Sequence, residues 1–119
     1  MDEKLISIAM EIILNAGNAR TLISEAGKSL AEFEIDKAEK ELKDAHDSIL
    51  IAHKAQTSMI QKEAEGEKID SSILFNHAQD TLMVTSSEYN MTKQLLNVTK
   101  SFDERLNKRR KEMSHETNN

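Results

Sequence analysis

The feature that most limits how this chain can fold is its uninterrupted helical pattern. The 119 residues contain no proline, and apolar side chains recur at intervals of three and four residues over most of the chain. Proline would interrupt a helix, and this spacing places apolar side chains along one face of an α-helix. Strands would require more β-branched and aromatic residues than this chain contains, with its three Phe and one Tyr. The sequence therefore predicts an all-α fold.

The pattern divides into three helical segments, at about residues 5–32, 34–65 and 71–106. Gly17 and Gly27 each lower the stability of the first helix by roughly 1 kcal/mol relative to alanine, but neither coincides with a break in the pattern. We therefore expect one continuous first helix. Gly17 also leaves open a close approach of another backbone at that point.

The breaks between the segments carry residues that are typical of helix ends. Gly66 is expected to cap the second helix in the left-handed conformation, and Asp70, Ser71 or Ser72 is expected to cap the start of the third. Connections this short place neighbouring helices antiparallel. Residues 1–106 are therefore predicted to form one domain, an up-down-up three-helix bundle.

The third segment is predicted to be longer than its partners and more widely apolar. Its excess length leaves residues 107–119 without intramolecular packing, and we expect them to form a polar, basic and frayed tail. Its apolar side chains cover more surface than three helices of one chain can bury, so the pattern predicts self-association. The seam of this segment contains Ile73, His77, Asp80, Val84, Met91, Leu95, Val98, Phe102 and Leu106, and further apolar residues are Leu74, Leu82, Met83 and Leu96.

Two polar residues occupy positions in this seam. His77 and Asp80 are three residues apart, so they project from the same face of a helix. A carboxylate in an apolar seam costs several kcal/mol unless it is paired, protonated or bound to a metal. From the spacing alone, a hydrogen-bonded core pair is the favoured interpretation. A metal site and a catalytic or phosphate-carrying histidine are the alternatives.

A second polar group, formed by His53, Gln56 and Thr57, lies on the second segment. From spacing alone it is interpreted as an exposed or half-buried flank. His53 lies about thirteen residues before Gly66 and His77 about eleven after it, so counting back from the turn places both histidines at similar heights in an antiparallel bundle.

The composition argues against several kinds of function. There is no cysteine, so there is neither a disulfide framework nor a thiolate metal site. The net charge of -5 gives no reason to expect nucleic-acid binding. No uncharged apolar run of about 18 residues is present, which predicts a cytoplasmic protein without a spanning helix. Motifs for nucleotide binding or hydrolysis, such as a Gly-rich phosphate loop or H-E-x-x-H, are absent as well.

The exception to the acidic balance lies near the C-terminus, where residues 100–111 carry a local net charge of +4 and leave -9 for the rest of the chain. Cations near the end of a helix are favoured by the macrodipole, which is the preferred interpretation. Docking to an acidic partner or a membrane surface is the alternative. The cations are Lys100, Arg105, Lys108, Arg109, Arg110 and Lys111, set against Asp103 and Glu104.

Four motifs occur in a consistent order and together resemble a known family. They are N-A-G-N-A-R at 15–20, A-H-K-A-Q-T-S-M-I at 52–60, E-A-E-G-E at 63–67 and H-A-Q-D-T-L-M at 77–83. This combination resembles the lactose/cellobiose-type IIA component of the bacterial sugar phosphotransferase system. The resemblance covers about residues 5–100, nearly the whole predicted domain.

The resemblance implies a phosphohistidine carrier built as a homotrimer of three-helix bundles. His77 would accept a phosphoryl group from the carrier protein HPr and pass it to the IIB protein, without a nucleotide. The membrane IIC component would then deliver a phosphorylated β-linked disaccharide of the cellobiose, chitobiose or lactose type. Asp80 from three subunits would meet around a divalent metal, for which carboxylate oxygens favour Mg²⁺.

The residues around His77 suggest how such a site would work. Gln79, together with His53, Gln56 and Thr57, would supply hydrogen bonds to the phosphoryl group, because phosphoryl transfer depends mostly on positioning and charge stabilisation. By position, Leu74, Phe75 and Ala78 would form an apolar rim for partner docking. One departure from the family pattern is Thr81, where a second histidine often follows the aspartate.

Two other classes of function compete with the carrier. One is a structural or regulatory helical oligomer, in which His77 and Asp80 form a polar core layer and no phosphate chemistry takes place. The other is a metal-binding bundle without phosphate transfer. Phosphorylation of His77 by the donor separates the carrier from both.

Overall fold

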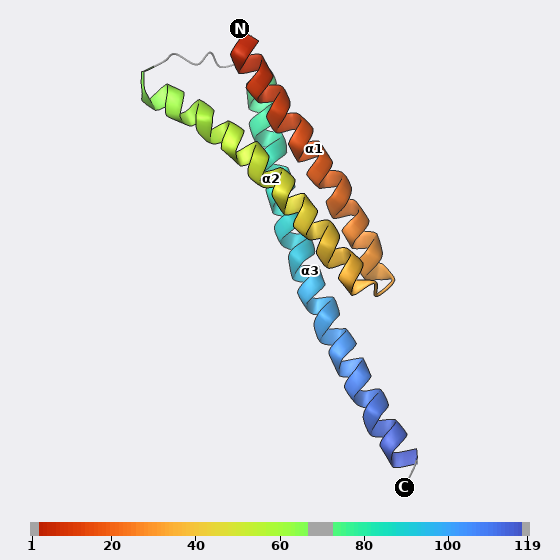
Figure 1. The fold of residues 1–119 in the computed structure, drawn as a ribbon. Helices are drawn as coiled ribbons and strands as arrows, with labels where there is room; N and C mark the ends of the chain where they lie inside the picture. The colour runs from red at the N-terminus through yellow and green to blue at the C-terminus, as the bar shows by residue number, and fades with distance from the viewer. Residues whose placement is uncertain (1–2, 67–72, 118–119) are drawn as a thin grey trace.

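The computed structural model describes residues 3–66 and 73–117, and within these ranges it contains three helices and no strand (Figure 1). They are α1 (Glu3–Ala31), α2 (Ile35–Ala64) and α3 (Ile73–Thr117). The predicted all-α fold is confirmed, and the ends of the first two helices agree with the sequence pattern to within two residues. The expected N-terminal cap of the third helix at Asp70, Ser71 or Ser72 lies outside the described residues.

The core joins α1 and α2 through small side chains at helical spacing. Alanines alternate with single large aliphatic residues, and small side chains allow two helix axes to approach closely. The largest side chains that are fully buried are those of Ile12, Met59, Leu82 and Thr85. The buried alanines of this core are Ala9, Ala19, Ala26, Ala38, Ala45, Ala52, Ala55 and Ala78.

α1 runs without interruption through Gly17 and Gly27, as expected. A Cβ added at Gly17 would meet no atom of another helix within 4 Å, so among the described residues no second backbone approaches closely there. Gly66 ends the turn after α2 with φ 94°, which confirms the predicted left-handed cap.

The turn between α1 and α2 is a tight helix end built around Phe33. The Phe33 N–H donates to the Leu30 carbonyl at 3.0 Å, and the Glu34 N–H donates to the Ser29 carbonyl at 2.9 Å. This pair of bonds requires a left-handed residue, and Phe33 adopts φ 58°. Glu34 is then free to begin α2 at once. A side chain at positive φ strains the backbone, and glycine avoids that strain.

Replacing Phe33 with glycine is therefore expected to leave the protein about 1 kcal/mol more stable than replacing it with alanine. The gain should appear as a higher midpoint of urea unfolding with an unchanged slope. Phe33→Ala is the matched control, because it removes the same half-exposed ring and keeps the strained backbone. An equal midpoint for the two variants would contradict the explanation by backbone strain.

The predicted end of the third helix at residue 106, with a frayed tail beyond it, is wrong. α3 continues to Thr117 and extends well past the α1–α2 turn, which makes the molecule 76 Å long and only 22 by 17 Å in cross-section (Figure 1). Helix propagation adds one hydrogen bond for each residue once the helix is nucleated. The Lys, Arg, Glu and Met residues of this segment are good helix formers, so packing is not needed to continue it.

The prediction of which face of α3 packs inward is also wrong, because α3 packs against α1 and α2 through a different face from the expected seam. The inward face includes two threonines, which a hydropathy pattern counts as polar. The Thr85 hydroxyl donates to the Thr81 carbonyl at 2.6 Å, and this bond allows a fully buried threonine. The core-facing residues are Phe75, Ala78, Leu82, Thr85, Thr92 and Leu96.

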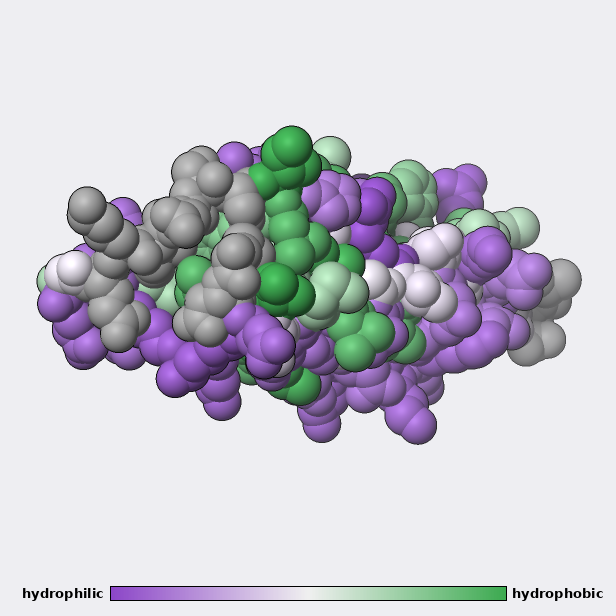
Figure 2. All heavy atoms as spheres, turned by 90° about the horizontal axis from the view of Figure 1, so that it is seen from above, coloured by the Kyte–Doolittle hydropathy of each residue, from purple (hydrophilic) through white to green (hydrophobic). Residues whose placement is uncertain are grey.

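The seam predicted from the sequence is instead an outward stripe, and most of its apolar side chains are about half exposed. Hydrophobic side chains also reach the surface in the view from the end where α1 begins (Figure 2). α3 therefore has two apolar faces, and the described part of the chain covers one of them. The outward stripe consists of Ile73, Val84, Met91, Leu95, Val98 and Phe102, with His77 and Asp80 among them.

Candidate functional site

His77 and Asp80 lie in the first turns of α3, and both side chains are exposed. Within residues 3–66 and 73–117, the imidazole of His77 has no hydrogen-bond or ion-pair partner, and neither has the carboxylate of Asp80. The interpretation of the two residues as a buried, hydrogen-bonded pair within one chain is therefore wrong. Their position on the outward stripe leaves the histidine accessible to another protein.

Thr81 is explained by a contact with the backbone. Its hydroxyl donates to the carbonyl of His77 at 2.7 Å, one helical turn earlier. Such a bond satisfies a threonine inside a helix without involving the imidazole. The hydroxyl of Thr81 is therefore hydrogen-bonded to the backbone of its own helix.

His53 and Gln56 lie beside a later part of α3 than the sequence suggested. The Nε2 atom of His53 is 3.4 Å from the hydroxyl oxygen of Ser86. Ser86 is nine residues beyond His77, about 13 Å along the helix. The expectation that His53 and His77 share one height is therefore wrong within a chain. The reason is that the count from Gly66 included residues 67–72, which precede α3. His53 lies eleven residues before the end of α2, whereas His77 lies only four residues after the start of α3.

An open groove of about 450 Å³ is lined by His53 and Gln56 on α2 and by residues of α3. Thr57 is exposed and Gln79 is half-buried on their respective helices. The proposed support of a phosphoryl group by these four residues stays a prediction. The α3 residues that line the groove are Leu82, Met83, Ser86, Ser87, Asn90 and Met91.

The predicted apolar docking rim is wrong for two of its three residues. Ala78 is fully buried and Phe75 is 9% exposed, because both belong to the core-facing side of α3. Leu74 is half-buried. The residue that sequence reasoning missed is Ile73, which is 90% exposed and lies one turn before His77 on the same face. Its membership of the outward stripe was visible in the sequence, but the stripe was assigned to the core.

Two ion pairs fix the position of α3 against its neighbours. Arg20 of α1 contacts Glu88 of α3 at 2.8 Å, and Lys100 of α3 contacts Glu39 of α2 at 2.6 Å. The hydrogen bond and charge of Glu39 raise the pKa of Lys100. Ion pairs between largely exposed side chains add little to the stability of a protein. We therefore expect these two pairs to set the register of α3 against α1 and α2 and to contribute little to the free energy of unfolding.

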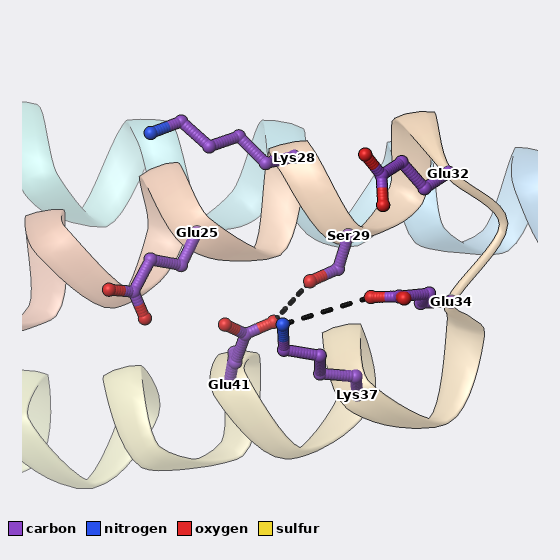
Figure 3. Close-up of a pocket in the computed structure, with 7 residues that line it drawn as sticks. All are labelled: Glu25, Lys28, Ser29, Glu32, Glu34, Lys37 and Glu41. Carbon is purple, nitrogen blue, oxygen red and sulfur yellow. Dashed lines mark hydrogen bonds and ion pairs between the residues drawn. The ribbon is translucent and has the colours of Figure 1, made fainter.

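A separate polar pocket lies at the α1–α2 turn and contains none of the predicted site residues. The Ser29 hydroxyl donates to Glu41 at 2.6 Å, and Lys37 pairs with Glu34 at 3.7 Å (Figure 3). The first contact links the end of α1 to α2, and the second lies within the first turn of α2, so the pocket is part of the hairpin structure. Its remaining lining residues are Glu25, Lys28 and Glu32.

A metal site cannot be assembled from one chain in the ranges that the structure describes. No group of three or more His, Asp or Glu side chains there is arranged so that it could hold a metal ion. Asp80 contributes a single exposed carboxylate, whose oxygens suit a hard divalent cation. The donor set is complete only if several chains bring their Asp80 side chains together.

Comparison with known proteins shows the family to which the chain belongs. The family described as "PTS system, Lactose/Cellobiose specific IIA subunit" matches residues 7–100. The chain belongs to this family. The resemblance inferred from the four motifs is thereby confirmed. As a IIA subunit, the chain is a phosphotransferase component of a sugar phosphotransferase system.

Relatives of this IIA subunit are named for different sugars. It is 39% identical to the lactose-specific EIIA component of Streptococcus mutans over 82% of this chain and 94% of that protein. It is 35% identical to the lichenan-specific IIA component of Bacillus subtilis over 87% of this chain and 94% of that protein. The crystal structure of PtcA from S. mutans superposes with a TM-score of 0.82 at 40% identity, covering 84% of this chain and 99% of that one.

The matched region also limits what the family explains. The family match ends at residue 100, so the last turns of α3 lie outside it. Among the described helices of this IIA subunit, none has the length and apolar character needed to cross a membrane.

Proposed function

We propose that this IIA subunit is a phosphohistidine carrier that accepts a phosphoryl group from HPr on His77 and passes it to a cognate IIB protein. The observation that carries the proposal is the exposure of His77, without a partner in the described ranges, within the H-A-Q-D motif. The other histidines on the bundle have neighbours. His46 stacks on Tyr89 with ring centroids 5.5 Å apart, and His53 contacts Ser86.

The proposed phosphoryl transfer uses the imidazole of His77 as a nucleophile, which is possible in its neutral form because one ring nitrogen then has a free lone pair. One ring nitrogen attacks phosphorus in line while the bond to the donor breaks, and the phosphoramidate that forms is reactive enough for onward transfer. An exposed side chain in the first turns of a helix can meet a donor and an acceptor in turn.

The homotrimer is supported by the outward stripe of α3. Its side chains between Val84 and Phe102 follow helical spacing and are about half exposed in the single chain. Three such stripes packed around an axis would remove these side chains from water, with a gain of about 25 cal/mol for each Å² buried. Docking of a neighbouring chain beside α3 would also place other residues near His77. Gln79, His53, Gln56 and Thr57 remain the proposed donors to the phosphoryl group.

The proposed metal is a divalent cation, Mg²⁺ by preference, held by three Asp80 side chains. Asp80 lies on the same stripe, so a threefold arrangement of α3 brings three carboxylates together. Three carboxylates at one axis repel one another unless a cation neutralises them. The cation would therefore stabilise the assembly, and His77 would carry the phosphoryl group.

Asp80→Asn is expected to abolish binding of Mg²⁺ to the assembled protein, measured by isothermal titration calorimetry. The variant should stay assembled in chelator and should melt no lower than chelated wild-type protein, because amides do not repel one another. Asp47→Asn, a change at an exposed position on α2, is the matched control and should leave cation binding intact. A chelator that alters neither the assembly nor the melting temperature of wild-type protein would rule out the axial metal.

The sugar is proposed only as a class, the β-linked disaccharides. Lactose and lichenan name different relatives of similar identity, so sequence similarity does not select one sugar.

The carrier proposal is tested by incubating the protein with phosphorylated HPr and measuring intact mass. One phosphate is expected on each chain, and adding the cognate IIB protein should remove it. The phosphate should be labile to acid, as phosphoramidates are. A wild-type protein that gains no mass would favour the structural oligomer instead.

A further inference from the structure

The last turns of α3 lie beyond the two other helices of the chain. Glu104 lines a pocket with Phe33 of the α1–α2 turn, and α3 continues past this turn (Figure 1). We call residues 105–117 the projecting end. Its residues up to Glu116 are all exposed, and the family match ends before it, at residue 100. The projecting end therefore belongs neither to the packed bundle nor to the region that the family match covers.

The projecting end contains two apolar residues, and both continue the outward stripe. Leu106 is 44% exposed and Met113 is 59% exposed. Leu106 follows Leu95 of the stripe by eleven residues, and Met113 follows Phe102 by the same interval. Eleven residues are close to three helical turns, so residues at this spacing stay on one face. Helix propensity explains why the segment is helical, but it does not explain why both apolar residues lie on this face.

The same interval runs through the whole outward stripe. A spacing of eleven residues drifts round a straight α-helix by only about 20° in each repeat. α3 is nearly straight along its length (Figure 1). The stripe therefore forms one apolar line that passes from the bundle onto the projecting end. Its two series at this interval are Ile73, Val84, Leu95 and Leu106, and Met91, Phe102 and Met113.

We propose that the projecting ends of three copies of this chain pack together as a parallel coiled coil, which continues the subunit interface past the bundle. The inference rests on the proposed homotrimer. If three outward stripes meet along an axis between Val84 and Phe102, three nearly straight helices bring the same residues of their projecting ends side by side. α1 and α2 do not reach this height and so do not separate the three helices (Figure 1).

The charges of this region suit copies that lie side by side. Residues 103–117 contain five cations and four carboxylates, so each copy adds a net charge of only +1. Arg109 lies on the stripe itself, eleven residues after Val98. Within the described ranges no ion pair joins Arg109 to a carboxylate. A parallel neighbour would bring its Glu112 within about one turn of Arg109, and charges beside the seam of a coiled coil pair between helices in this way.

The test uses single-cysteine variants, because the chain has no cysteine of its own. Met113→Cys is expected to give covalently linked chains with a short bifunctional maleimide, and Leu95→Cys should do so within the bundle. Lys111→Cys is the matched control, since this exposed residue lies on the opposite face of α3. It should give at most about a tenth of the linked product, because its copies point away from one another. Denaturing gel electrophoresis measures the yield.

The outcomes separate this proposal from the homotrimer on which it rests. Linkage of Leu95→Cys chains without linkage of Met113→Cys chains would overturn the proposal and leave the homotrimer in place. Linkage of neither would overturn both. Linkage that occurs only when Leu106→Cys and Met113→Cys chains are refolded together would show antiparallel pairing between two assemblies, and it would also overturn the parallel coiled coil. Intact mass after incubation with phosphorylated HPr tests the carrier function separately.

A second measurement tests whether the contact stabilises the assembly. Leu106→Lys combined with Met113→Lys is expected to remain a trimer, because the stripe within the bundle is intact. Its dissociation constant, measured by sedimentation equilibrium in dilute urea, should rise at least about tenfold. Asn107→Lys combined with Ser114→Lys is the matched control, since it adds two lysines at exposed positions one residue further along α3. This control should dissociate as wild-type protein does, and equal dissociation constants for the two double variants would overturn the proposal.

Discussion

His77→Gln is expected to reduce phosphorylation by HPr to below detection, while wild-type protein gains one phosphate on each chain. Glutamine keeps a polar side chain of similar reach and is a good helix former, but its amide is not a nucleophile. Because His77 is exposed and its imidazole forms no hydrogen bond or ion pair within the described ranges, the change should leave the fold intact. Intact mass after incubation with phosphorylated HPr measures the result, and circular dichroism checks the helices.

The matched control is His46→Gln. His46 is also an exposed histidine, but it stacks on Tyr89 in a different groove. This variant should accept phosphate as wild-type protein does. His53→Gln should retain one phosphate and lose only speed, if its role is to support the phosphoryl group. A His77→Gln protein that still gained one acid-labile phosphate would place the carrier function on another histidine.

Leu95→Lys is expected to convert the proposed homotrimer into monomers that remain helical. Leu95 lies in the middle of the outward stripe and is 56% exposed in the chain, so the substitution costs little within one bundle. In a threefold assembly it removes three leucines whose exposed half becomes buried, each contributing about 1 kcal/mol, and brings three ammonium groups together. Sedimentation velocity measures the mass of the particle.

The control for this prediction is Asn97→Lys, on the side of α3 that lines a groove with α2. It adds the same charge two residues away and should leave the assembly unchanged. If the Leu95→Lys protein sedimented like wild-type protein, α3 would not form the axis of the assembly. The same result would remove the basis for a metal bound by three Asp80 side chains.

The two predictions separate the competing functions. A structural oligomer would lose its assembly in Leu95→Lys but would have no phosphate for His77→Gln to abolish. A metal-binding bundle would depend on Asp80 alone. Only a carrier requires both the exposed histidine and a protein that loads it.

The helices and the site motif could be predicted because they depend on local pattern. Spacing of three and four located the helices, and Gly66 marked the end of the second. The order of four motifs identified the family, which the match over residues 7–100 confirmed. Errors arose where two patterns competed. The inward face of α3 was not recognised because it contains buried threonines, which a hydropathy pattern counts as polar. The end of α3 was placed too early because residues of high helix propensity continue the helix without packing.

The sequence by itself determined that the chain is helical and that His77 and Asp80 lie on one face of a helix. It also determined the family to which the chain belongs. These properties depend on residue identity and on spacing along one helix. Only the tertiary structure decided which face of α3 points inward, that His53 lies beside Ser86, and that Phe75 and Ala78 are buried. The reason is that a helix with two apolar faces has no local preference between them. Packing against α1 and α2 makes the choice, and it leaves the stripe that carries His77 in contact with solvent.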